Sequence, residues 1–290
     1  MKDLVDLFEA ERPALLSISY RMLGERSAAE DVVQEVWLRF AAGRAIENPR
    51  AWLRRVATNV AIDTLRSAQK RRETYVGPWL PEPLISAHEP STETGFELAQ
   101  ECELALLWAM ERLAPVERAA FVLREAFDAD YAEIAAILER SEASCRQMVS
   151  RAHKRLQSEG PRFDVSREEA AEALERFFLA ATQDHAAALE MLASDAMAIS
   201  DGGGKASAAL RVLHGPQDIM TVLTAVMSRE KDIPGMRFAM VRANNAPAIA
   251  RYHDDVLDAV TTLVPNAQGE VQWLYIMRNP DKLGRALSTD

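Results

Sequence analysis

Apolar residues recur at helical spacing through the first 74 or so positions of the chain. The first helix is indicated by an apolar set at intervals of three and four residues, namely Leu4, Leu7, Phe8, Leu15 and Leu16. A second helix is predicted to begin with Ser27 as its N-cap and with Glu30 completing a capping box. Its inward side is expected to hold Ala29, Val32, Val33, Val36 and Phe40. The pattern breaks from Gly43 to Pro49, and a third helix is predicted from Pro49 to about Arg72.

A proline-rich stretch follows this first helical block. Between Gly77 and Glu93 the chain has no helical period, and it contains Pro78, Pro81, Pro83 and Pro90. Each proline fixes its φ angle and removes a backbone N–H donor, so this stretch is predicted to be an extended linker. A second helical block is predicted from about residue 95 to residue 158.

The last part of the chain changes character. Two helices are predicted at 166–182 and 184–193, and the glycine run Gly202–Gly204 then interrupts the pattern. Three β-like runs follow, at 236–243, 248–264 and 271–278. Helices followed by a strand meander indicate an α+β domain with helices on one face of a curved sheet.

The predicted organisation is therefore multidomain, with two all-α domains and one α+β domain. The expected boundaries are a helical domain at 1–75, a linker at 76–95, a second helical domain at 96–160 and the α+β domain at 164–290.

Composition places the chain among ordinary folded proteins. It has 290 residues, of which 48% are hydrophobic and 27% charged, which suits two or three domains. No apolar run approaches the roughly 18 residues of a membrane span, and the acidic start from Met1 to Asp6 is not a signal peptide. Cys102 and Cys145 belong to no CxxC or Cys/His cluster, so neither a disulfide framework nor a structural zinc site is predicted. We expect a cytoplasmic protein without a membrane partner.

The net charge of −10 argues at first against a nucleic-acid partner. Basic residues are nevertheless concentrated in two clusters, which are Arg50, Arg54, Arg55, Arg66, Lys70, Arg71 and Arg72, and Arg140, Arg146, Arg151, Lys154 and Arg155. Basic side chains bind DNA phosphates by releasing counterions, whereas acidic surroundings weaken that binding. The two clusters therefore suggest a DNA contact that needs help from a partner. The alternative is that they only complement helix dipoles.

The second basic cluster lies on a predicted helix-turn-helix. A short helix is indicated by the apolar positions Tyr131, Ile134, Ala135 and Leu138. A tight turn through Glu139 and Arg140 follows, with glutamate where such turns often have glycine, and Ser141 then caps a longer helix. Its inner face is expected to be Cys145, Val149, Ala152 and Leu156. Its outer face presents Arg146, Gln147, Ser150, Arg151 and Lys154, residue types that contact base edges and phosphates in the major groove.

A polar and acidic stripe marks the outer face of the second predicted helix. It consists of Asp31, Gln34, Glu35 and Leu38, spaced by three and four residues. Taken alone, such a stripe is most simply a solvated helix face.

Three segments together resemble the extracytoplasmic-function (ECF) sigma factors, which are sigma-70-type initiation factors of bacterial RNA polymerase. They are Glu30–Leu38 (EDVVQEVWL), Pro49–Asp63 (PRAWLRRVATNVAID) and Tyr131–Ala135 (YAEIA), and the likeness runs from residue 1 to about 158. Three further segments are similar to those of the subgroup that carries a fused C-terminal SnoaL-like (NTF2-like) domain. These are Trp79–Leu84 (WLPEPL), Asp201–Lys205 (DGGGK) and Asn279–Leu283 (NPDKL).

The resemblance implies a role for each polar face. The stripe of Asp31, Gln34, Glu35 and Leu38 would dock on the clamp helices of the polymerase β′ subunit, and the β flap is a further expected partner. The unwound minus-ten element would meet the 43–49 loop and Arg54, Arg55, Asn59, Asp63, Arg66, Lys70, Arg71 and Arg72. The minus-thirty-five duplex would be read by Ser144, Arg146, Gln147, Ser150, Arg151 and Lys154. The mechanism implied is positional: one chain bridges two promoter elements on the polymerase and makes no covalent bond.

The resemblance also implies that the C-terminal domain is regulatory and stands in place of a separate anti-sigma protein. The residues expected to carry this control are Trp79, Leu80, Pro81, Glu82, Pro83, Leu84, Asp201, Gly202, Gly203, Gly204, Asn279, Pro280, Asp281, Lys282 and Leu283. We expect a monomer in the free state, and no catalytic residue, metal or cofactor.

Two other functions stay open from the residues alone. The first is a one-component regulator that senses a small molecule and binds its operator without polymerase. The second is a DNA-tethered isomerase or cyclase, which needs a carboxylate or histidine base in an apolar pocket. Its candidates are Asp201, His185, His214 and His253.

Overall fold

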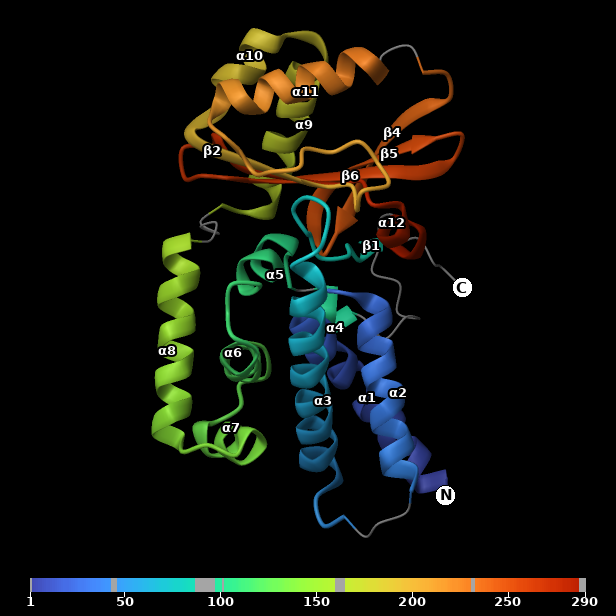
Figure 1. Ribbon diagram of the computed structural model, residues 1–290, viewed down its shortest axis with the longest axis vertical. Helices are drawn as coiled ribbons and strands as arrows, with labels where there is room; N and C mark the ends of the chain where they lie inside the picture. The colour runs from blue at the N-terminus through green and yellow to red at the C-terminus, as the bar shows by residue number, and fades with distance from the viewer. Residues whose placement is uncertain are drawn as a thin grey trace. The chain divides into compact units, whose positions relative to one another are not determined.

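The computed structural model describes residues 2–42, 46–86, 97–100, 102–159, 165–230 and 233–286. The chain divides into two compact units (Figure 1). The first comprises Met1–Thr74, Ser91–Cys102 and Leu106–Gly160, and the second comprises Tyr75–Pro90, Glu103–Ala105 and Pro161–Asp290. Within the described residues, no helix combines the length and the apolar character needed to traverse a membrane.

The first unit begins with three long helices, α1 (Lys2–Leu23), α2 (Arg26–Ala41) and α3 (Pro49–Arg72), and a short α4 (Glu97–Gln100). Helix α1 contacts each of the other three. Its apolar residues Leu15, Leu16, Ile18, Tyr20 and Met22 are completely buried. Removing these side chains from water supplies the main driving force for the bundle.

The expected start of α2 is wrong by two positions. The helix begins at Arg26 with Glu25 as N-cap, and that cap makes no side-chain hydrogen bond. Gly24, at φ 69°, lets the chain turn sharply after α1, so the first turn of α2 already contains Ser27. Glu30, which was expected in a capping box, instead forms an i, i+4 ion pair with Arg26 at 3.2 Å.

Helix α3 starts as its sequence predicts. The side chain of Asn48 accepts a hydrogen bond from the backbone N–H of Ala51 at 3.2 Å, and Pro49 occupies the first helical position. Proline suits that position because the first turn needs no donor there and its φ angle is already helical.

Four more helices follow before the second unit: α5 (Leu104–Met110), α6 (Pro115–Phe127), α7 (Tyr131–Leu138) and α8 (Glu142–Glu159). Arg118 on α6 is fully buried; its Nε donates to the Arg21 carbonyl at 2.9 Å and its Nη1 to Glu111. Glu111 also accepts from Arg72 at the end of α3. A buried ionic network therefore joins the early and late helices of the first unit.

The second unit is built on a seven-stranded sheet in the order β1-β4-β5-β6-β7-β2-β3. The strands are β1 (Ile85–Ser86), β2 (Leu192–Asp201), β3 (Leu213–His214), β4 (Met236–Ala243), β5 (Ala246–His253), β6 (Val256–Pro265) and β7 (Val271–Met277). All neighbouring strands run antiparallel except β2 and β7. Helices α9 (Arg167–Gln183), α10 (His185–Glu190) and α11 (Pro216–Glu230) gather on one face of the sheet, and α12 (Pro280–Ala286) follows β7 (Figure 1).

Helix α9 starts on a capping box. The Ser166 hydroxyl accepts from the backbone N–H of Glu169 at 3.2 Å, and the Glu169 carboxylate accepts from the Ser166 N–H at 2.9 Å. Its buried face, with Leu174 and Phe177, packs into one core with the sheet residues Ile249 and Leu274.

Three expectations for this unit need correction. The 184–193 helix ends at Glu190, because the chain enters β2 at Leu192 and pairs with β7 far along the sequence. Strand β2 and helix α11 were not predicted at all. The single run 248–264 is two strands, β5 and β6, since Asp254 and Asp255 adopt φ angles of 46° and 63° and close a hairpin there.

Candidate functional site

Helices α7 and α8 form a helix-turn-helix in the first unit. Asp130 caps α7 by accepting from the Glu133 N–H at 2.7 Å. Glu139, at φ 53° and ψ 51°, supplies the left-handed residue that ends α7, a conformation that glycine adopts more readily. Ser141 accepts from the Ser144 N–H at 3.2 Å as α8 begins. The turn therefore forms with glutamate in the place where glycine is usual.

The two faces of α8 separate as its pattern predicts. Cys145, Val149 and Ala152 are buried, and Leu156 is half-buried; burial raises the pKa of the Cys145 thiol. The outward face holds Arg146, Gln147, Ser150, Arg151 and Lys154, all exposed, while Ser144 is half-buried.

Two arginines of this face are engaged by carboxylates of the same unit. Arg146 pairs with Glu142 at 3.2 Å and lies over the Tyr131 ring at 5.1 Å. Arg151 pairs with Glu117 of α6 at 2.9 Å. The Arg151 guanidinium must leave Glu117 before it can contact a phosphate.

One face of α3 carries the polar residues expected at the minus-ten element. Asn59, Asp63, Arg66 and Lys70 are all exposed and follow helical spacing along the helix. Asp63 and Arg66 form an ion pair at 2.8 Å. Residues 43–45 of the predicted minus-ten loop lie outside the described residues.

Three other arginines of α3 make contacts inside the first unit. Arg54 lies 3.7 Å from the buried carboxylate of Glu11, and Arg55 pairs with Glu139 in the turn of the helix-turn-helix. Arg72, whose side chain is 12% exposed, donates to the Leu23 carbonyl at 2.8 Å and pairs with Glu25 at 3.1 Å. The expected phosphate role does not fit Arg72 in this arrangement, because its guanidinium is held among acidic groups and carbonyls. Arg71 is exposed.

The polar stripe of α2 lies on the surface. Asp31, Gln34 and Leu38 are exposed, and Glu35 is half-buried and bonded to Arg39 at 3.0 Å. Leu38 leaves 59% of its surface in water, although Val32, Val33 and Val36 on the same helix are buried. A leucine so exposed within an acidic stripe is a good contact for a partner protein.

In the second unit, Asp201 at the end of β2 is the centre of a hydrogen-bond cluster. Its carboxylate is completely buried. One oxygen, Oδ1, accepts from the Tyr75 hydroxyl at 2.6 Å and from the Gly203 N–H at 3.0 Å. The other, Oδ2, accepts from the Leu80 N–H at 2.9 Å and from Lys282 Nζ at 2.7 Å.

Lys282 and Asn279 bring the C-terminal segment to the same cluster. Besides Asp201, Lys282 Nζ donates to the Leu80 carbonyl and lies 4.2 Å from the centre of the Trp79 ring. Asn279 Nδ2 donates to the Tyr75 hydroxyl at 2.8 Å. The segments Trp79–Leu84, Asp201–Lys205 and Asn279–Leu283 thus meet around one buried ion pair.

The glycine run allows this close approach. Gly203 and Gly204 have φ angles of 60° and 70°, which most residues avoid. A Cβ atom on Gly203 would lie 2.4 Å from Asn279 Nδ2, and one on Gly202 would lie 2.2 Å from the Ala206 carbonyl oxygen. Lys205 instead makes an exposed pair with Asp281 at 2.6 Å.

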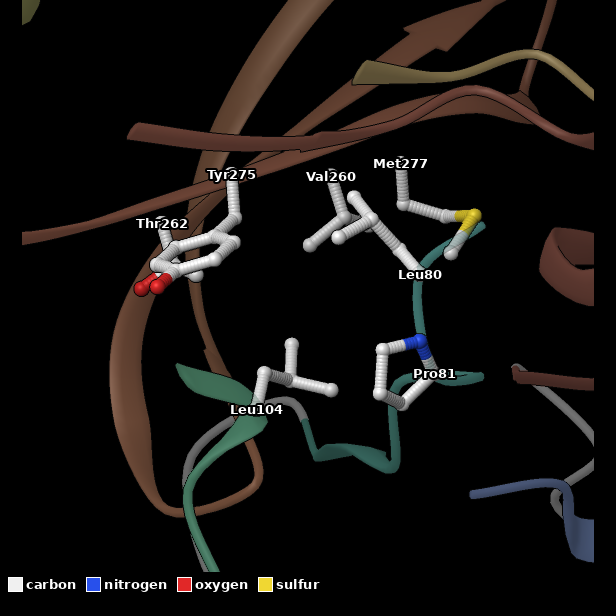
Figure 2. Close-up of a pocket in the computed structure, with 7 residues that line it drawn as sticks. All are labelled: Leu80, Pro81, Leu104, Val260, Thr262, Tyr275 and Met277. Atoms are coloured by element: carbon white, nitrogen blue, oxygen red, sulfur yellow. The ribbon is translucent and has the colours of Figure 1, made fainter. Parts of the chain in front are cut away.

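Apolar contacts extend the cluster along the linker. Figure 2 shows Leu80 beside Val260 and Met277. These residues and Pro81 line a void of only about 10 Å³. Glu82, Pro83 and Leu84 are buried as well. The Leu84 N–H donates to Asn244 Oδ1 at 2.9 Å, and β1 then adds to the edge of β4. Residues 77–86 are therefore part of the sheet structure and do not form a free tether.

The residues considered for enzymatic chemistry are scattered. Asp201 is enclosed in the cluster just described, and His214 and His253 are exposed. His185 lines the large cavity of the second unit and bonds through Nδ1 to the Thr224 hydroxyl at 2.7 Å. Among the described residues, no group of three or more histidine, cysteine or acidic side chains is placed to hold a metal.

Two residues of the cluster escaped prediction. Tyr75 bridges Asp201 and Asn279 but carries no recognisable motif. The other is Asn244, whose side chain accepts a hydrogen bond from the linker residue Leu84. Asn244 and Asn245 have φ angles of 51° and 62°, and two such asparagines in a row are a sequence signal for a hairpin that could have predicted this turn.

Comparison with known proteins identifies the class first. The family model for sigma-70 region 2 matches residues 7–71, and the model for sigma-70 region 4 matches residues 103–156. These are the two helical modules of a sigma-70-type transcription initiation factor.

The relatives then define the family. The chain is 34% identical over 292 residues to the ECF RNA polymerase sigma factor SigJ of Mycobacterium tuberculosis, covering 96% of this chain and 92% of that protein. It is 34% identical over 154 residues to the probable sigma factor SigI of the same species, covering 51% of this chain and 52% of SigI. The crystal structure of M. tuberculosis SigJ matches with a TM-score of 0.77 and 30% identity, over 97% of this chain and 98% of that one. The chain belongs to the ECF RNA polymerase sigma factors.

These findings confirm the predicted class of fold and the predicted class of function. Two helical modules precede a sheet-containing SnoaL-like domain, and the SigJ match covers all of them. Sigma factors are transcription initiation factors that work with the RNA polymerase core and promoter DNA.

Proposed function

We propose that the C-terminal unit controls initiation by this sigma factor, and that it does so by holding the linker. The observation that carries the proposal is the cluster around Asp201. It joins the linker to the end of β2 and to α12 by a buried ion pair and by hydrogen bonds from Tyr75 and Leu80. The spacing and freedom of the two DNA-binding modules depend on the length of chain between them that is free. Linker residues bound to the sheet cannot contribute to that span.

The proposal assigns a surface of the first unit to each partner. The exposed stripe of Asp31, Gln34, Glu35 and Leu38 on α2 would meet the β′ clamp helices. The exposed residues of α3, namely Arg55, Asn59, Asp63, Arg66, Lys70 and Arg71, together with the half-buried Arg54, would meet the separated minus-ten strand. A basic surface with polar side chains is suitable for a single strand. The α8 face would read the minus-thirty-five duplex near the β flap.

Three further expectations belong to the proposal. The free chain is a monomer, and no separate anti-sigma protein is needed, because the regulatory element is covalently attached. Its place of action is the cytoplasm, where promoter DNA and the polymerase core are found. Sedimentation of the purified chain tests the first of these expectations.

Reconstituted run-off transcription with core polymerase tests the proposed control. A chain that ends at Arg278 lacks the Asn279–Leu283 segment, and we expect promoter-specific output to change relative to the full chain. Lys282→Met addresses the same contact by a single substitution, and Lys205→Met, which removes an exposed ion pair, is its matched control. Unchanged output from the truncated chain and from Lys282→Met would contradict control through the linker.

Polymerase binding is tested by Leu38→Ala. We expect about a tenfold loss of affinity for core polymerase, because truncation of a central interface residue costs about 1–2 kcal/mol. Leu179, on α9 and 54% exposed, supplies the control variant Leu179→Ala. Gel shifts with promoter DNA should require core polymerase. A specific shift by a dimer of the chain alone would favour the one-component regulator instead.

A further inference from the structure

The second unit contains a large cavity on the helical face of its sheet. Its volume is about 660 Å³, within the range of sites that enclose small molecules. The walls come from α9, α11 and the inward side of the sheet, and include Phe177, Phe178, Ile249, Leu274 and Ile276. Leu80 and Pro81 of the linker contact the opposite side of the sheet.

Two basic side chains lie at the wall of this cavity. Arg251 and Arg278 both line it, and their side chains are only 12% and 11% exposed. Asp258 pairs with Arg251 and lies 3.7 Å from Arg278, so two guanidinium groups share one carboxylate and keep a net positive charge. No aspartate or glutamate is found among the described lining residues. Arginine at such a depth is suited to recognising a carboxylate, because its planar N–H groups match the two oxygens.

Most of the remaining lining residues are apolar and favour an apolar ligand. Phe178 and Phe238 both line the cavity and meet in an edge-to-face arrangement with ring centres 4.9 Å apart. Phe238 leaves 48% of its surface in water, which is unusual for so large an apolar side chain. An apolar ligand that entered here would cover that surface and gain from its burial.

We propose that this cavity binds an apolar carboxylate, with its chain or rings against the phenylalanine and aliphatic walls and its carboxylate toward Arg251 and Arg278. The proposal does not depend on transcription, because it concerns binding by the second unit alone. It does have a consequence for the linker: Ile276 and Thr261 line the cavity, whereas their neighbours Tyr275, Met277, Val260 and Thr262 line the linker void on the other face. A ligand would therefore contact the two strands on which the linker docks.

Isothermal titration calorimetry on the full chain tests the proposal, with decanoate below its aggregation limit as probe. We expect saturable binding of one decanoate, at least tenfold tighter than that of 1-decanol, which has the same chain without the charge. Saturating decanoate should also raise the melting temperature, since it binds the folded chain. This comparison uses the unaltered protein and so does not depend on how any variant folds.

Two variants locate the site. Arg278→Met should weaken decanoate binding at least tenfold and leave decanol binding within twofold. Arg237→Met is the matched control, because Arg237 lies on the same sheet, pairs with Asp255 at 3.1 Å and does not line the cavity. The affinity of this variant for decanoate should stay within twofold of that of the unaltered chain. The proposal is overturned by the absence of saturable decanoate binding or by equal affinities for decanoate and decanol. It is also overturned by loss of binding in the folded Arg237→Met variant.

Discussion

Lys282 Nζ lies 2.7 Å from Oδ2 of Asp201, and both side chains are buried. The two residues are 81 positions apart in the chain. The same Asp201 oxygen also accepts from the Leu80 N–H, so a single carboxylate ties the C-terminal segment and the linker to the sheet. Buried ion pairs are strongly sensitive to the loss of one partner, because the remaining charge has no compensation.

Lys282→Met should therefore destabilise the second unit markedly. Breaking a buried ion pair from one side costs about 3–5 kcal/mol, and the Leu80 carbonyl loses a donor as well. Urea unfolding measures the loss, and hydrogen exchange at the Leu80 amide reports whether the linker is released. The matched variant Lys205→Met breaks an exposed pair with Asp281 and should cost at most about 1 kcal/mol. Equal losses in the two variants would argue against a special role for the buried pair.

Gly203→Ala should disturb the same cluster by steric overlap. Its φ angle of 60° strains any other residue, and the new Cβ would meet Asn279 at 2.4 Å. Asn279 cannot move freely, because it bonds to the Tyr75 hydroxyl and to the Asp281 N–H. We expect a loss of about 2–4 kcal/mol.

Gly269→Ala separates the two causes. Gly269 has a φ angle of 78° but nothing within 4 Å of an added Cβ, so the variant reports backbone strain alone, about 1 kcal/mol. Thermal or urea unfolding compares the two. If Gly203→Ala loses no more unfolding free energy than Gly269→Ala, Asn279 moves away from the new Cβ without destabilising the fold.

The helical faces could be predicted because each depends on local spacing. Cys145 and Val149 lie inside and Gln147 and Ser150 outside on α8, as a period of 3.6 residues requires. The same holds for Val33 against Gln34 on α2. The ion pairs of Arg72 and Arg151 could not be predicted from local spacing, because their partners Glu111 and Glu117 lie on other parts of the chain.

The linker cluster could not be derived from periodicity. Tyr75 lies 126 positions from Asp201 and 204 from Asn279, and no local pattern reports contacts at such separations. The three motifs were singled out by family resemblance alone. Strand β2 was missed for a related reason: LASDAMAISD has few β-branched residues, and it is fixed as a strand by its parallel pairing with β7.

Glu117→Gln should strengthen binding to the minus-thirty-five duplex, if the α8 face has the proposed role. Glu117 accepts from Arg151 at 2.9 Å and lies 3.7 Å from Arg155, so its carboxylate competes with DNA phosphates for both. We expect holoenzyme affinity to rise about twofold to fivefold, because an ion pair of this exposure is worth about 0.4–1 kcal/mol. The slope of affinity against salt should also steepen, because more phosphates are neutralised.

Glu125→Gln is the control for that experiment. Glu125 lies on the same helix and bonds to His153 at 3.0 Å, away from Arg151. The two variants change the net charge equally, so a general electrostatic effect would raise the affinity in both. An increase confined to Glu117→Gln assigns the effect to the released arginines. An unchanged affinity in Glu117→Gln would remove Arg151 from the proposed DNA-binding face.

Asp218, in the first turn of α11, should make stability depend on pH in the acid range. Two hydrogen bonds from the Arg211 guanidinium, each 2.7 Å, and one from the His214 N–H lower the pKa of Asp218 from 3.8 to about 2. A carboxylate whose pKa is lowered by folding stabilises the fold above the unfolded value, and this stabilisation is lost as the pH falls through the folded value. The unfolding free energy of the wild-type chain should therefore exceed that of Asp218→Asn above about pH 4, and the difference should shrink as the pH falls toward 2. Carboxyl-carbon NMR titration measures the pKa directly, and Arg211→Met should return it toward 3.8. A titration midpoint near 3.8 in the wild-type chain would show that the two hydrogen bonds from Arg211 to Asp218 do not persist in solution.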